Sequence, residues 1–215
     1  MSGRRRALER RLAAVKRFST PRIDLEQYPT PPAIAASFVH FADLRSDISD
    51  RRIIDLGSGT GMLAIACGCR TPAQVVGIER DREAIAIANE NVKIVEPACE
   101  IDWIHGDVLH PPLVPQTEAT VVMNPPFGAQ QENIHADRRF LEVAASLGRV
   151  SYSFHNAGSQ DFIEAFAADN QGTITDAFTT EFDLARQFSF HESEKTTIPV
   201  ELYRIEWQAS GYDER

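Results

Sequence analysis

With 215 residues, of which 43% are hydrophobic and 25% charged, the chain is long enough to build one α/β domain around a full core. It contains no apolar run near the roughly 20 residues of a membrane span, and its basic N-terminus lacks the apolar stretch of a secretory signal. Three cysteines are too few for a disulfide framework, and Cys67 and Cys69 would point to different faces of one predicted helix. We therefore expect free thiols in a reducing cytoplasm and no metal site.

Positive charge is concentrated at the N-terminus. Residues 1–22 contain eight arginines and lysines against one glutamate, a net charge of +7, whereas the whole chain carries −9 and the remainder therefore −16. An acidic body repels nucleic acid, so the basic arm that begins with Arg4, Arg5 and Arg6 is where phosphate contact is expected. A solvated tail is the alternative that composition leaves open.

Helical and strand patterns alternate along the chain. Helical spacing of apolar residues predicts helices over residues 4–18, 33–44, 62–70, 82–95, 137–147 and 159–168. Apolar or alternating runs predict strands over residues 51–56, 73–78, 101–105, 119–123, 149–154, 173–184 and 198–208. This order predicts a doubly wound α/β fold with a mostly parallel seven-stranded sheet and an antiparallel C-terminal strand pair. Residues 23–215 are expected to form this single domain, preceded by the basic arm of residues 1–22.

A proline-rich segment, residues 25–32, precedes the helix predicted for residues 33–44. Its rigid backbone suits one wall of a pocket, with Gln27 and Thr30 as hydrogen-bonding groups and Tyr28 as an apolar surface. The alternative is a linker that ends with Thr30 as the N-cap of the helix, and the local sequence favours it.

The predicted strand 51–56 runs directly into a glycine-rich turn, with Gly57, Gly59 and Gly61 at alternate positions before the next helix. Glycines let the chain turn sharply and let a ligand approach the backbone, close to the free N–H groups at the start of the helix. The spacing is not that of a dinucleotide-binding turn, and Asp55 beside it suits an ammonium group and disfavours a phosphate.

Two carboxylates follow the next two predicted strands. Glu79 ends strand 73–78 and is expected to accept hydrogen bonds from both hydroxyls of a ribose, with a surface glutamate as the alternative. Asp107 follows strand 101–105 and is expected to accept from an adenine amino group, with a turn-forming aspartate as the alternative.

Asn124, Pro125, Pro126 and Phe127 follow the apolar strand 119–123, at the carboxyl end where open α/β sheets bind ligands. Two prolines stiffen the backbone, so that the asparagine oxygen and a prolyl carbonyl can accept from one –NH₂ group. Phe127 offers a flat apolar face to a planar ring. The alternative is an ordinary Asn-Pro turn.

The order of these elements resembles that of the class I S-adenosylmethionine-dependent methyltransferases, in which Asn-Pro-Pro-Phe is typical of amino-nitrogen methylation. Four motifs resemble, more narrowly, the methyltransferase-like protein 5 family, which methylates adenine N6 in small-subunit ribosomal RNA. They are Leu-Glu-Gln-Tyr-Pro-Thr at residues 25–30, Asp-Leu-Gly-Ser-Gly-Thr-Gly at 55–61, Gly-Asp-Val at 106–108 and Val-Met-Asn-Pro-Pro-Phe-Gly at 122–128. The resemblance implies a Rossmann-like methyltransferase fold and S-adenosylmethionine as the methyl donor.

The resemblance also implies roles for single residues. The cofactor-binding set is Gln27, Tyr28, Thr30, Asp55, Gly57, Gly59, Thr60, Gly61, Glu79, Asp107, Val108 and Asn124. The catalytic set that holds the target base is Asn124, Pro125, Pro126 and Phe127, and Phe127 together with Arg4, Arg5 and Arg6 of the basic arm is expected to bind the substrate. Residues 129–132 lack the basic side chains that relatives carry there, which weakens the case for RNA contacts by the lid expected at residues 129–136.

The activity predicted from these features is methyl transfer from S-adenosylmethionine to N6 of an adenine in small-subunit rRNA, in the cytoplasm. Three alternatives stay open: guanine N2 in rRNA, a glutamine amide of a protein, and a catalytically silent RNA-binding subunit. The resemblance also implies a partner, a small zinc-containing activator subunit that adds a strand to the sheet edge at residues 101–105.

Overall fold

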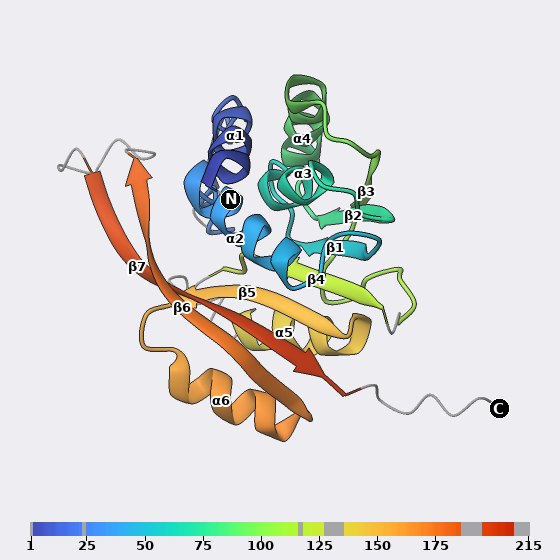
Figure 1. The fold of residues 1–215 in the computed structure, drawn as a ribbon, viewed down its shortest axis with the longest axis vertical. Coiled ribbons are helices and arrows are strands. Elements are labelled where there is room, and N and C mark those ends of the chain that lie inside the picture. The colour runs from blue at the N-terminus through green and yellow to red at the C-terminus, as the bar shows by residue number, and fades with distance from the viewer. Residues whose placement is uncertain (1, 23–24, 116–117, 127–135, 186–194, 209–215) are drawn as a thin grey trace.

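The computed structural model describes residues 2–22, 25–115, 118–126, 136–185 and 195–208. These residues form a seven-stranded sheet in the order β3-β2-β1-β4-β5-β7-β6 (Figure 1). The strands are β1 (Arg52–Leu56), β2 (Gln74–Glu79), β3 (Ile101–His105), β4 (Ala119–Met123), β5 (Val150–Asn156), β6 (Gly172–Ala185) and β7 (Lys195–Trp207). Neighbours among β1 to β5 pair in parallel, whereas β7 pairs antiparallel with both β5 and β6. The predicted doubly wound fold with its antiparallel C-terminal pair is confirmed.

Six helices in the described residues cover the two faces of this sheet (Figure 1). On one face lie α1 (Ser2–Leu12), α2 (Pro32–Leu44), α3 (Met62–Gly68) and α4 (Arg82–Val95), and on the other lie α5 (Ala136–Leu147) and α6 (Gln160–Asp169). Successive strand residues point to opposite faces, so Ile53 joins the buried cluster under α2 and α3 while Ile54 joins the cluster under α5 and α6. The buried runs of the parallel strands thus supply both cores.

Strand register brings three segments to one rim of the sheet. Leu56 pairs with Ile78 of β2 on one side and with Met123 of β4 on the other. The carboxyl ends of β1, β2 and β4 therefore lie side by side, and the residues that follow β1 and β4, Gly57 and Asn124, meet there.

The N-terminal helix α1 ends at Leu12, and the predicted end at residue 18 is wrong. Beyond it the Lys16 N–H donates to the side-chain oxygen of Asn91 on α4, at 2.7 Å, instead of continuing the helix. The apolar side of α1 is buried in the same cluster as α2. The division into an arm, residues 1–22, and a domain, residues 23–215, stays a prediction.

The start of α2 also differs from the sequence expectation. Pro31 is the N-cap residue, no side-chain oxygen caps the helix, and Pro32 occupies its first position, which a residue without an N–H tolerates. The predicted cap at Thr30 is wrong because the hydroxyl of Thr30 accepts a hydrogen bond from Asn124 instead.

The edges of the sheet are β3 and β6, which confirms the predicted edge position of residues 101–105. Within the described ranges, none of the helices has the length and apolar character that crossing a bilayer demands.

Candidate functional site

The glycine-rich turn after β1 is fastened to β2 through its backbone. The N–H groups of Gly57 and Ser58 both donate to the carbonyl oxygen of Ile78, at 2.9 and 3.0 Å. Gly57, Gly59 and Gly61 have φ angles of 71°, 54° and 88°, which residues with a side chain rarely adopt. The alternating glycines are therefore a conformational requirement of this turn.

Asp55, near the end of β1, is 1% exposed. Its carboxylate accepts from the Ala64 N–H in the first turn of α3, at 2.9 Å. Burial raises the pKa of Asp55 to about 7 against the opposing effect of that bond, and the neighbouring carboxylate of Glu79 adds to the rise. A cation bound against Asp55 would offset both the burial and the repulsion, so the site suits the expected ammonium group.

Glu79, at the tip of β2, is 8% exposed, which excludes the alternative of a surface glutamate. Its Oε2 accepts from the Gly59 N–H at 2.8 Å, and its Oε1 accepts from the Asp81 N–H at 2.9 Å. Burial raises the pKa of Glu79, although these backbone bonds lower it in part. The side chain thereby joins the tip of β2 to the glycine turn.

The segment before α2 closes another side of the site. Gln27 donates through Nε2 to Oδ2 of Asp81 at 2.7 Å, and its Oε1 accepts from a backbone N–H of the preceding segment at 2.8 Å. Gln27 and Thr30 are 8% and 4% exposed. Residues 25–30 are therefore a packed wall, and the linker interpretation is wrong.

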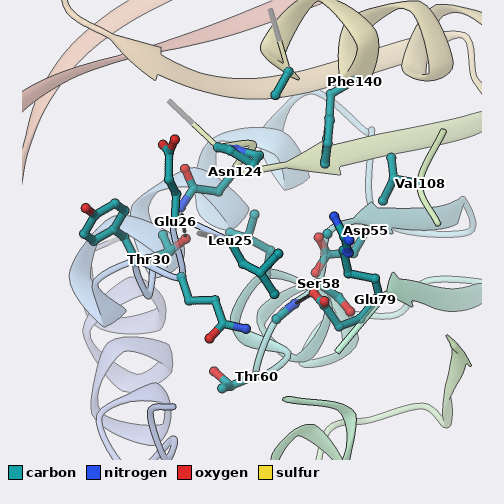
Figure 2. Close-up of a pocket in the computed structure, with 18 of the residues that line it drawn as sticks. Leu25, Glu26, Thr30, Asp55, Ser58, Thr60, Glu79, Val108, Asn124 and Phe140 are labelled. Carbon is teal, nitrogen blue, oxygen red and sulfur yellow. Dashed lines mark hydrogen bonds between the residues drawn. The ribbon is translucent and has the colours of Figure 1, made fainter. Parts of the chain in front are cut away.

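Asn124, directly after β4, has one bonded and one open end. Its Nδ2 donates to Oγ1 of Thr30 at 3.2 Å, whereas its Oδ1 is buried and has no hydrogen-bond partner among the described residues. Figure 2 shows Asn124 and Thr30 on one side of the pocket and Asp55 and Glu79 on the other. A buried oxygen that accepts no hydrogen bond costs free energy, and an N–H group of a ligand that donates to Oδ1 would remove this cost.

These side chains surround one cavity of about 220 Å³. Phe140 of α5 and the buried Val108 form part of its wall (Figure 2). Asp107 also lines it, and its Oδ1 accepts from the Leu109 N–H at 3.0 Å. Asp107 therefore forms a turn, as in the alternative interpretation, and also borders the pocket.

The cavity brings together most of the site residues predicted from the sequence. Those that line it are Gln27, Tyr28, Thr30, Asp55, Gly57, Gly59, Thr60, Glu79, Asp107, Val108, Asn124 and Pro126. Of the other described members of the set, Gly61 and Pro125 are buried but do not line the cavity.

The predicted substrate-binding residues are not at the cavity in the described part of the chain. Arg4, Arg5 and Arg6 lie on α1 and do not line it; Arg5 donates to Oγ of Ser37 on α2 at 2.9 Å, and the other two are exposed. Phe127 lies outside the described residues, as does the expected lid at residues 129–136 apart from its last residue.

The sequence analysis did not single out several cavity residues: Phe18, Leu25, Glu26, Ser58, Met62, Leu63, Arg80, Leu109, Arg139 and Phe140. Two of them touch the glycine turn. A Cβ placed on Gly57 would lie 3.1 Å from the ring of Phe140, and one on Gly59 would lie 3.0 Å from the ring of Phe18. Both contacts join distant segments, so the local sequence held no signal for them. Leu25 and Glu26 stand in the Leu-Glu-Gln-Tyr-Pro-Thr motif, which was a usable signal.

Comparison with known proteins identifies the family to which a chain with this site is similar. The family model "Methyltransferase small domain" matches residues 35–150. The chain is 36% identical over 210 residues to an uncharacterized protein of Methanocaldococcus jannaschii, with 94% of each chain covered. It is 35% identical over 207 residues to the rRNA N(6)-adenosine-methyltransferase Mettl5 of Drosophila melanogaster, covering 94% of this chain and 95% of that protein.

Solved structures agree with the architecture. A crystal structure of a protein from Pyrococcus horikoshii superposes with a TM-score of 0.85 at 32% identity, covering 95% of this chain and 98% of that one. The likeness therefore extends over nearly the whole of both chains.

Proposed function

We propose that this chain, which belongs to the methyltransferase small domain family, transfers a methyl group from S-adenosylmethionine to N6 of an adenine in small-subunit rRNA. The relative from Drosophila melanogaster carries the name of an rRNA N(6)-adenosine-methyltransferase and is similar over nearly its full length. The family match and the similarity to this relative support methyl transfer to RNA. The geometry of the pocket supports the roles that we assign to its residues.

The polar groups of the pocket fit the cofactor. When bound, S-adenosylmethionine supplies an electrophilic methyl group on a sulfonium leaving group. Asp55 and Glu79 are two buried carboxylates on one pocket, and a positively charged ligand offsets their mutual repulsion. In our proposal Asp55 holds the ammonium end beside the glycine turn, Glu79 holds the ribose, and Asp107 with Val108 holds the adenine ring of the cofactor.

The observation that carries the proposal is the open Oδ1 of Asn124. This oxygen is buried without a donor among the described residues, while Thr30 fixes the other end of the amide. An exocyclic amino group supplies the missing N–H. In our proposal the two N6 hydrogens of the target adenine donate to Asn124 Oδ1 and to the Pro125 carbonyl oxygen, which directs the nitrogen lone pair toward the methyl group.

Charge development explains why these acceptors accelerate the reaction. Positive charge grows on N6 as the new bond forms, and two fixed oxygens stabilise it more in the transition state than in the ground state. We propose that the adenine is flipped out of its RNA and stacks on Phe127, while Pro126 keeps the backbone stiff. The arginines of the basic arm, Arg4, Arg5 and Arg6, are proposed to contact RNA phosphates.

The edge strand β3 is the proposed docking site for a small zinc-containing activator subunit. Among the described residues, its position at the end of the sheet leaves one side of its backbone ladder open to an added strand. Free cysteines at residues 67, 69 and 99 support a location in a reducing cytoplasm.

The test is incubation of the enzyme with small-subunit rRNA and labelled S-adenosylmethionine, followed by digestion to nucleosides, chromatography and mass detection. The proposal predicts label in N6-methyladenosine and its loss in Asn124→Ala. Label in a methylated guanine would agree with the proposed mechanism but would show that the substrate is guanine and not adenine. Cofactor binding without any label, even with the activator subunit added, would contradict the proposed rRNA substrate and favour a protein amide or a silent RNA-binding subunit.

A further inference from the structure

Asn91 is a buried amide that the reaction itself does not use. It lies on α4 and is 0% exposed. Its Oδ1 accepts from the Lys16 N–H at 2.7 Å, and its Nδ2 donates to the carbonyl oxygens of Lys16, at 3.0 Å, and Thr60, at 2.9 Å. One side chain therefore joins three parts of the molecule: α4, the segment after α1, and the glycine turn.

Two further contacts attach the last turn of α1 and the segment after it to α4. The guanidinium of Arg11 donates to the carbonyl oxygens of Val95 and Glu96 at the end of α4, at 2.7 and 2.8 Å. The ammonium group of Lys16 pairs with Glu90 at 2.8 Å, although both side chains are more than half exposed, so that this pair adds little. The bonds that hold the segment most firmly are those of Asn91 and Arg11.

This attachment places Phe18 against the glycine turn. The ring of Phe18 leaves only 3.0 Å to a Cβ built on Gly59, and Phe18 lines the cavity. Gly59 in turn donates its N–H to Glu79. A ligand on the turn thus meets an apolar wall that comes from the N-terminal segment rather than from the sheet.

We propose that residues 11–18 are a cover for the cofactor end of the pocket, with Phe18 as its wall and Asn91 as the positioning residue that holds it against the turn. The identity of the ligand rests on the proposed function. In this proposal the N-terminal segment retains the cofactor, which is a separate role from the RNA contacts proposed for the basic arm. Asn91 acts through Lys16 and Thr60 and does not touch the ligand.

The experiment is calorimetric titration of the full chain with S-adenosylmethionine, combined with melting temperature and with KM and kcat on rRNA. Asn91→Ala removes all three bonds, and we expect the Kd for S-adenosylmethionine to rise about tenfold. KM for the cofactor should rise by the same factor and kcat at saturation should stay unchanged. The matched control is Asn89→Ala, on the same helix, because Asn89 is exposed and its amide donates locally, to the Ile85 carbonyl oxygen one turn earlier.

Phe18 supplies a second variant that removes no hydrogen bond. Phe18→Ala should raise the Kd for S-adenosylmethionine about tenfold, and Phe18→Leu should restore most of the affinity because it keeps an apolar wall. If Asn91→Ala does not fold, the Phe18 pair decides. A lower melting temperature with an unchanged Kd in the Asn91 variant, or an unchanged Kd in Phe18→Ala, overturns the cover. Failure of the wild-type chain to bind S-adenosylmethionine overturns the proposed function as well.

Discussion

The carboxyl-terminal rim of the sheet has two regions that differ in how completely their polar groups are bonded. At β1 and β2, the carboxylates of Asp55 and Glu79 already accept backbone N–H groups from Ala64, Gly59 and Asp81. At β4, the amide of Asn124 is bonded at its nitrogen and open at its oxygen. We infer that the first region is rigid before any ligand arrives, and that the second keeps an acceptor for the reacting nitrogen.

The largest effect is expected at the open acceptor. Asn124→Ala removes the oxygen that is proposed to stabilise the positive charge developing on N6, and the methyl-transfer rate should fall about 10²- to 10³-fold. The Kd for S-adenosylmethionine should change less than about twofold, since the side chain is proposed to act on the target base. Single-turnover methylation of rRNA together with calorimetry separates the two quantities, and an unchanged rate would remove Asn124 from the mechanism.

A smaller effect, of the opposite kind, is expected in the bonded region. Glu79→Gln replaces one of two accepting oxygens by an –NH₂ group that faces a backbone N–H. We expect the Kd for S-adenosylmethionine to rise about 10- to 100-fold while the rate at cofactor saturation holds. Glu83→Gln, on the exposed start of α4, is the control for loss of one negative charge. A Kd that stays at the wild-type value would show that Glu79 does not hold the cofactor.

The pH dependence of cofactor binding sharpens the comparison further. Asp55 has a pKa of about 7 and must be ionised to pair with the proposed ammonium group, so affinity should rise with pH, by at most about tenfold per unit, up to about pH 7. The unliganded protein should lose stability over the same range, because its folded form holds the proton more tightly than the unfolded chain does. Asp55→Asn should flatten both profiles. Calorimetry and thermal melts from pH 5 to 9 check this, and wild-type profiles that match those of the variant would contradict it.

The smallest effect is expected at Thr30, whose hydroxyl orients the amide of Asn124. Thr30→Val keeps the shape of the side chain and removes the acceptor for Nδ2. The rate of methyl transfer should fall about fivefold, which corresponds to one ordinary hydrogen bond. Thr30→Ser, which retains the hydroxyl, should restore it, and equal rates for the valine and serine variants would show that the hydroxyl does not orient the amide.

Local patterns were sufficient where a segment's own sequence fixes its structure. The predicted bounds of α4, β3 and β4 agree with the structure residue for residue. The start of α4 is set by Asp81, whose side chain caps the helix by accepting a hydrogen bond from the Glu83 N–H. The helical spacing of its apolar residues sets the remainder of the helix. Strands β3 and β4 are short apolar or alternating runs, and the residues on either side of each run end the strand.

Tertiary contacts decided the points that the sequence analysis missed. Threonine is a common N-cap residue, but the hydroxyl of Thr30 accepts a hydrogen bond from Asn124, which lies 94 positions away in the sequence. Helical spacing continues past Leu12, yet the N–H of Lys16 bonds to Asn91. Asn91 falls at helical spacing from the buried Ala88, so its burial was foreseeable, whereas its three partners were not.

The central claim is that the two regions of the rim act separately, one on the cofactor and one on the target nitrogen. The most direct test measures the Kd for S-adenosylmethionine and the single-turnover rate for the wild type, Glu79→Gln, Asn124→Ala and the double variant. We predict that each single variant changes only its own quantity, and that the free-energy changes add in the double variant within about 0.5 kcal/mol. An Asn124→Ala variant that weakens cofactor binding as strongly as Glu79→Gln does would contradict the claim.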